Sequence, residues 1–246
     1  MRERTLSPIA LDFVWEALDA GEPPYPLEVQ SHGATVDGRR MLRQRVREDL
    51  IANRLLTPAG RLEPELEEWL LALANADLSI DSVFLPDTGA EPVLALAASG
   101  RGAAVLAVQQ KSGLHLRPIP RDGLVSAVVG MLPPARRGTE TSISLPAAEL
   151  AAVGGGVNQR ASDVETRKAL ARLTALPNQR GGQIAVNSRT EMRGRRRSPV
   201  LSWFDNETGR YLTQSRADWA TIAPADAATL RQRLIEMTRL VTVEQR

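Results

Sequence analysis

Near its start, the chain has apolar residues at the spacing of a helix. These positions are Leu11, Val14, Trp15 and Leu18, and the face that they share should meet a core. Ser7 can cap this helix and Pro8 suits its first position, while Gly21 is expected to end it. The pattern therefore predicts an amphipathic helix at the beginning of the fold.

Three further segments precede a change of period. Alternating apolar residues over Tyr25–Val29 predict a short strand, and the charged stretch from Asp37 to Arg54 predicts a polar helix. Another helix should begin near Pro64, and its apolar face would consist of Leu66, Trp69, Leu70 and Leu73.

From Leu78 the apolar residues recur at every second position, which is the spacing of strands. Turn residues separate four such runs, as in an antiparallel meander. Asp122 should then introduce an apolar helix that stops at Pro133. The predicted strands are Leu78–Leu85, Val93–Ala98, Ala103–Val108 and Leu114–Ile119.

The second half repeats this order of elements. Ile119–Leu124 and Ala223–Ala228 both read as strand, proline, aspartate and helix. Two such units in one domain, residues 1–246 with halves 1–135 and 139–246, predict an α+β fold. Its sheet would be central, mostly antiparallel, flanked by helices and pseudo-twofold. The predicted elements are a strand at Ile143–Leu145, a helix at Ala161–Leu176, strands at Gln183–Arg189, Val200–Phe204, Arg210–Gln214 and Trp219–Ile222, and a helix from Pro224.

Composition favours a soluble globular protein with an aliphatic core. Aromatic residues are only 4% of the 246 residues, and a chain of this length buries about 70% of its unfolded surface. The absence of cysteine excludes disulfides, thiolate zinc sites and cysteine nucleophiles. The first residues lack the apolar stretch of a signal peptide, and the most apolar window, Gly123–Pro133, is too short to cross a bilayer. We therefore expect a cytoplasmic protein without membrane insertion.

Charge is distributed unevenly although the net charge is only +2. Residues 159–216 hold 12 basic and 5 acidic residues, a local balance of +7, and the rest of the chain has a balance of −5. No basic residue occurs between Glu63 and Glu91. Such asymmetry can orient a charged partner and accelerate its association.

Few residues have the spacing of a catalytic or metal site. His32 and His115 are the only histidines, and a catalytic centre requires several convergent groups. Gly154–Gly156 lacks the Lys-Ser/Thr that a phosphate-binding loop carries. Glu65, Glu67 and Glu68 follow Pro64 at a helix start, where the dipole stabilises acids. We therefore expect that the protein is not an enzyme and binds no metal or cofactor. An enzyme with an unrecognised carboxylate site is the last alternative.

The basic run Arg193-Gly194-Arg195-Arg196-Arg197 supports a second functional hypothesis. Clustered arginines can neutralise phosphates without reading sequence, so the run could belong to a nucleic-acid-binding module. It lies between two predicted strands, with neither a recognition helix nor an aromatic platform beside it, which favours a solvated hairpin loop. Contact with an acidic protein or an anionic membrane surface is a further alternative.

Several segments resemble the EspG family in their amino-acid sequence and in their order, over nearly the whole chain. No single motif is diagnostic, but many short matches occur in the right order. They are Leu6-Ser7-Pro8, Phe13–Leu18, Pro24–Leu27, Gly60-Arg61-Leu62, Ala104–Val108, Leu116-Arg117-Pro118, Trp203-Phe204-Asp205, Gly209-Arg210-Tyr211 and Ala223–Asp226.

This resemblance implies a chaperone of type VII (ESX) secretion in actinobacteria. Members of the family cover the apolar tip of a helical PE–PPE heterodimer, mainly through its PPE subunit, and need no cofactor or nucleic acid. A homodimer remains possible. The surface expected to bind the partner combines the loop 86–92, the loop 154–160 and the following helix. Its residues are Pro86, Asp87, Glu91, Gly155, Val157, Asn158, Val164, Leu170 and Leu173.

Overall fold

The computed structural model describes residues 3–100, 102–148, 164–190, 194–216 and 218–242. Over these residues, six α-helices flank a mostly antiparallel sheet of eleven strands, which confirms the predicted fold class. The chain divides into two compact units. The first contains Met1–Asp81, Val93–Val128 and Ser188–Arg195, and the second contains Ser82–Pro92, Val129–Asn187 and Arg196–Arg246.

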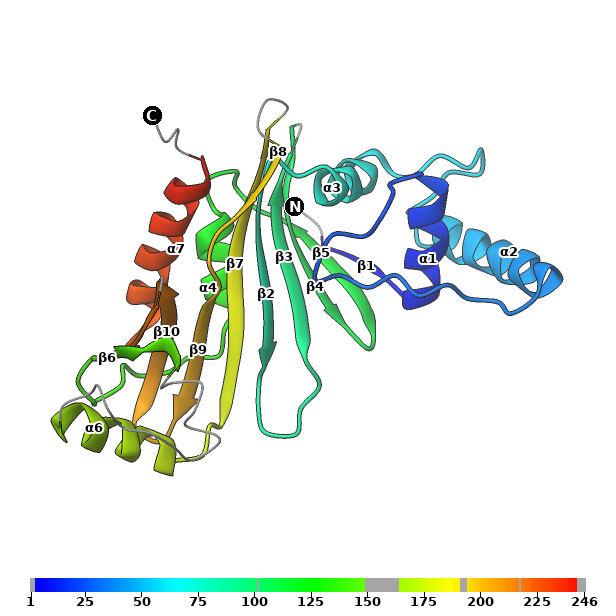
Figure 1. Ribbon diagram of the computed structural model, residues 1–246. Coiled ribbons are helices and arrows are strands. Elements are labelled where there is room, and N and C mark those ends of the chain that lie inside the picture. The colour runs from blue at the N-terminus through cyan, green and yellow to red at the C-terminus, as the bar shows by residue number, and fades with distance from the viewer. Residues whose placement is uncertain (1–2, 101, 149–163, 191–193, 217, 243–246) are drawn as a thin grey trace. The chain divides into compact units, whose positions relative to one another are not determined.

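The first unit carries three helices beside four consecutive strands of the sheet (Figure 1). The strands follow the order β1-β5-β4-β3, and every pair in this order is antiparallel. The helices are α1 (Pro8–Ala17), α2 (Val36–Ala52) and α3 (Pro64–Ala74), and the strands are β1 (Arg4–Leu6), β3 (Val93–Ser99), β4 (Ala104–Gln110) and β5 (Gly113–Pro118).

The core of this unit forms where α1 and α3 meet the strands, as the helical spacing predicted. Ser7 caps α1, because its Oγ accepts a hydrogen bond of 3.2 Å from the backbone N–H of Ala10. The buried indole of Trp15 donates to the carbonyl of Gly21 at 2.8 Å. The helix ends at Ala17, earlier than predicted. The buried cluster includes Leu11, Val14, Leu66, Leu70, Leu73, Leu96 and Leu116.

The strand predicted at Tyr25–Val29 is wrong, because this segment has no regular structure. Leu27 is nevertheless buried and belongs to the core. The backbone of Glu28 pairs with a side chain in place of a neighbouring strand. Gln109 accepts from the N–H of Glu28 at 2.8 Å and donates to its carbonyl at 2.6 Å. Alternation alone could not reveal that a side-chain amide supplies these hydrogen bonds.

The second unit contains a second run of antiparallel strands in the order β9-β10-β11-β6. Its elements are β6 (Ile143–Pro146), α6 (Val164–Ala175), β9 (Leu201–Asn206), β10 (Gly209–Arg216), β11 (Trp219–Pro224) and α7 (Ala227–Thr242). Four elements contribute residues to both units: β2 (Leu78–Leu85), α4 (Leu124–Met131), β7 (Arg180–Thr190) and β8 (Gly194–Arg197).

Tyr211 on β10 is central to a small apolar cluster of the second unit. Its ring is fully buried, and its hydroxyl accepts hydrogen bonds from the backbone N–H groups of Thr139 and Glu140 at 3.0 and 3.1 Å. This arrangement fixes the segment before β6 without leaving its donors unpaired. The cluster also contains Ile143, Leu145, Ala169, Leu173 and Ile222.

The final helix begins at Ala227, so the predicted start at Pro224 is wrong. Pro224 is the last residue of β11 and lies opposite Tyr211. Asp226 precedes the helix, and its Oδ1 accepts from the backbone N–H of Thr229 at 2.8 Å and from the Thr229 hydroxyl at 2.9 Å. Asp226 therefore satisfies a donor at the helix start that would otherwise be unpaired.

Replacing Asp226 with alanine should lower the free energy of unfolding by about 1 kcal/mol at neutral pH. The backbone N–H and hydroxyl of Thr229 hold the pKa of Asp226 below its ordinary value. The stabilisation is thus complete above the unfolded-state pKa of about 3.9 and is lost as the pH falls through the lower folded-state value. Urea unfolding at pH 7 and at pH 3 measures both effects.

Asp226→Asn is the matched control, because asparagine caps helices as well as aspartate does. We expect this variant to retain most of the free energy of unfolding at pH 7. Its stability should not contain the contribution to the pH dependence that titration of Asp226 makes. An equal loss from both substitutions at pH 7 would contradict the capping role.

Candidate partner-binding surface

The loop between β2 and β3 is well ordered by its own hydrogen bonds. The Asp87 carboxylate accepts from the backbone N–H of Thr88 at 2.7 Å, and the Asp87 carbonyl accepts from the N–H of Ala90 at 3.2 Å. The Thr88 hydroxyl donates to the carbonyl of Gln179 at 3.2 Å. Loop 86–92 therefore lies against the segment that connects α6 to β7. Asp87 and Glu91 are exposed, and Pro86 is half-buried.

Helix α6 supplies an apolar side chain to the same unit's surface. Val164 at its first turn is 54% exposed, and Leu170 is half-buried against the Tyr211 cluster. Leu173, which the sequence placed on the binding surface, is only 3% exposed and belongs to the core. Leu173 thus seats the helix, and a partner cannot reach it while α6 is packed. Gly155, Val157 and Asn158 lie outside the described residues.

An ion pair fixes the outer side of α6. The guanidinium of Arg172 donates to both carboxylate oxygens of Glu140, with distances of 3.2, 3.2 and 2.9 Å. These hydrogen bonds raise the pKa of Arg172 above its ordinary value. Because the N–H of Glu140 donates to the buried Tyr211 hydroxyl, the pair ties α6 to the core. The helix can therefore present Val164 at a fixed position.

The basic run forms a strand and is not the solvated loop that the sequence predicted. Gly194–Arg197 is β8, which pairs with β7. Arg195 and Arg197 are exposed, and Arg197 donates to the Asn187 side chain at 2.9 Å. Arg193 lies outside the described residues. Successive side chains of a strand point to opposite faces, so Arg195 and Arg197 share one face of β8 and Arg196 lies on the other.

The two histidines occupy structural positions. His115 is exposed on β5 between buried Leu114 and Leu116, as the alternation predicted. His32 lies 3.3 Å from Asp12, whose carboxylate also accepts two hydrogen bonds from Arg39. Burial acts to raise the pKa of Asp12, but its hydrogen bonds from Arg39 and the His32 backbone outweigh that effect and lower it. The described residues contain no cluster of metal-binding side chains.

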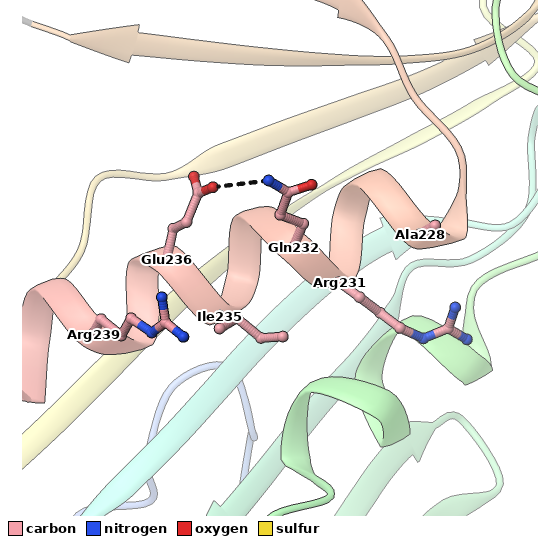
Figure 2. A pocket seen from close by; sticks show the side chains of 6 residues that line it. All are labelled: Ala228, Arg231, Gln232, Ile235, Glu236 and Arg239. Atoms are coloured by element: carbon pink, nitrogen blue, oxygen red, sulfur yellow. Dashed lines mark hydrogen bonds between the residues drawn. The ribbon is translucent and has the colours of Figure 1, made fainter.

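Sequence reasoning missed two concave surfaces. One, of about 470 Å³, lies along the outer face of α7 and is lined by Arg231, Ile235 and Arg239 among others (Figure 2). Gln232 donates to Glu236 at 3.3 Å beside it. Ile235 is 44% exposed, and an isoleucine on the charged side of an amphipathic helix was the available signal. The other, of about 780 Å³, lies between α1, α2 and the loop that precedes α3.

A comparison with models of protein families shows to which family the chain belongs. The model of the EspG family matches residues 7–236. The chain belongs to the EspG family. Its resemblance to EspG proteins, first visible in short segments such as Gly209-Arg210-Tyr211, is thereby confirmed.

A solved structure supports the EspG fold independently. It is that of the Mycobacterium tuberculosis type VII secretion system chaperone EspG5 in complex with the PE25–PPE41 dimer. The match has a TM-score of 0.68 and 14% sequence identity, and it covers 99% of this chain and 98% of that one. Among curated proteins none matches. Every helix in the described part of this EspG chain is too short or too polar to span a membrane.

Proposed function

We propose that this EspG-family protein is a cytoplasmic chaperone of type VII secretion, which binds a PE–PPE-type helical heterodimer and keeps it soluble. Membership of the EspG family over residues 7–236 is the observation that carries this function. The likeness to an EspG5 chaperone solved with a PE–PPE dimer supports the class of partner. The chain would act by binding alone, without a reaction or a cofactor.

The surface proposed to bind the cargo is formed by loop 86–92 and the start of α6. Val164 supplies an exposed apolar side chain, and Asp87 and Glu91 supply negative charge. A helical pair that is to be exported exposes an apolar end, which aggregates unless a partner covers it. Apolar contact at Val164 would provide affinity, and the acidic loop would orient the cargo.

Co-expression tests this function directly. The full chain should co-purify with a PE–PPE pair from its own genome and elute as one complex with one copy of each protein. Light scattering during size-exclusion chromatography measures that mass, and it shows whether the free chain is a monomer or a homodimer. Failure with every such pair would overturn the function.

A shift of duplex DNA in electrophoresis at physiological salt, abolished by alanine at Arg195, Arg196 and Arg197, would favour the nucleic-acid hypothesis.

Val164→Glu should weaken cargo binding by about tenfold, which corresponds to the loss of one moderate apolar contact. Its side chain is 54% exposed, so the fold should tolerate the change. Ile235→Glu on α7 is the matched control, since Ile235 is also exposed, at 44%, but lies on the other missed surface. Titration calorimetry with the purified pair measures both. Loss of affinity in Ile235→Glu alone would move the cargo site to α7.

A further inference from the structure

The larger concave surface has walls made mostly of core residues. Phe13 and Val14 on α1, and Val46 and Leu50 on α2, line it although none is more than 7% exposed. These side chains therefore reach the space only by their edges. The result is an apolar cleft of about 780 Å³ within the first unit. Pockets that hold small ligands have volumes of about 300–1,000 Å³ and mainly apolar walls.

The opposite wall is a turn whose backbone is fixed. Leu56 and Leu62 are bridged across it, and the Thr57 side chain accepts from the backbone N–H of Arg61 at 3.0 Å. Gly60 adopts a φ of +83° there, a conformation that glycine favours. Arg47 on α2 donates to the carbonyl of Pro58 and so joins the turn to the helix. The cleft is therefore pre-formed.

The residues that line the cleft carry an excess of positive charge. Arg43, Arg47 and Arg61 line it together with one acid, Glu67. Arg43 is neutralised by Glu16, to which it donates at 3.0 and 3.2 Å. Arg47 contacts a neutral carbonyl, and within the described ranges the Arg61 side chain makes no hydrogen bond or ion pair. Arg47 and Arg61 thus line an apolar space together with a single carboxylate, Glu67.

We infer that this cleft binds a single-chain amphiphilic anion, such as a long-chain fatty acid, with its chain against Val14, Val46 and Leu50. Its head group would lie beside Arg61 and Arg47. Charge complementarity and the burial of the apolar lining residues favour this ligand over a helix of another protein, which would require a broad exposed apolar face. Both the carboxylate of a fatty acid and the phosphate of a lysolipid can accept charge-assisted hydrogen bonds from the Arg61 guanidinium.

Titration calorimetry of the full chain with oleate, below the micellar concentration, tests the inference. We expect saturable binding at one site, weakened by about tenfold or more in Arg61→Glu because a repulsive charge replaces an attractive one. Arg40→Glu is the matched control: Arg40 is on the same helix as Arg47, is exposed and pairs with Asp37 outside the cleft. It should bind oleate like the parent chain.

Two further arms define the ligand. Oleyl alcohol, which lacks the charge, should bind more weakly than oleate, and Arg61→Glu should not change its affinity. Comparing the affinities of oleoyl lysophosphatidate and oleate shows whether the site prefers a phosphate or a carboxylate head group. Ala17→Trp places a large side chain on an exposed position that lines the cleft and should abolish binding of all three. Absence of saturable oleate binding, or equal losses in Arg61→Glu and Arg40→Glu, would overturn the inference. The inference would also be overturned if the chain self-associates and Ala17→Trp removes that self-association.

Discussion

Asp205→Ala should lower the free energy of unfolding by about 3–5 kcal/mol, the usual effect of breaking one partner from a buried ion pair. The Arg210 guanidinium donates to both oxygens of Asp205 at 2.7 and 2.8 Å, and the two side chains are 3% and 2% exposed. Arg180 adds a contact of 3.2 Å to the same carboxylate. Removing Asp205 leaves Arg210 as a buried cation that has lost this ion-pair partner.

Arg210 cannot turn outward to recover its hydration. Its guanidinium lies 4.4 Å from the centre of the Trp203 ring, and its Nη2 donates to the carbonyl of Pro133 at 2.7 Å. These contacts hold the charge in place, so its desolvation is not relieved when the acid is lost. Asp205, through Arg210, therefore holds the turn between β9 and β10 against the segment between α4 and β6.

Urea unfolding followed by circular dichroism measures the loss, and Glu236→Ala provides the matched control. Glu236 pairs with Arg233 at 2.8 Å, but both side chains are more than 40% exposed, so less than about 1 kcal/mol is expected. The double variant Asp205→Ala, Arg210→Met should recover part of the loss, because no uncompensated charge stays buried. Equal losses in Asp205→Ala and Glu236→Ala would contradict this account.

Periodicity predicted the elements that bury one face. Leu66, Leu70 and Leu73 are buried on α3 as their spacing indicated, and β5 alternates between buried and exposed residues. In contrast, β3 and β4 are buried over most of their length. Errors occurred where a specific polar contact determines the backbone. Gln109 replaces a strand partner at Glu28, and Asp226 caps a helix that starts three residues beyond Pro224. Such contacts join residues whose proximity only the folded chain reveals.

The candidate sites were less accessible to sequence analysis. Loop 86–92 and α6 were proposed from the sequence as parts of the binding surface, and this assignment stays a prediction. Leu173 was misplaced, because one face of an amphipathic helix does not reveal which of its apolar residues the core covers. The cleft lined by Val14 and Val46 was invisible, since its walls consist of residues that also form the core. A cavity depends on how elements pack, and spacing along one element carries no information about it.

Gly182→Ala should destabilise the protein by about 1–3 kcal/mol through overpacking. A Cβ at Gly182 on β7 would lie 2.4 Å from the Cβ of Phe84 and 2.6 Å from the carbonyl oxygen of Val83. Neither atom is the end of a flexible side chain, so the backbone of a strand must move. Phe84 is 5% exposed and its ring lies 6.1 Å from that of Trp203, which leaves it little room to shift.

Gly130→Ala distinguishes this steric effect from the general effect of replacing glycine. Gly130 is exposed on α4, and no atom lies within 4 Å of the position that its Cβ would take. Alanine there should stabilise the protein by about 0.4–1 kcal/mol, because it restricts the unfolded chain and favours the helix. Thermal unfolding of the two variants should therefore shift in opposite directions. A fall of similar size in both would show that Phe84 does not require glycine opposite it.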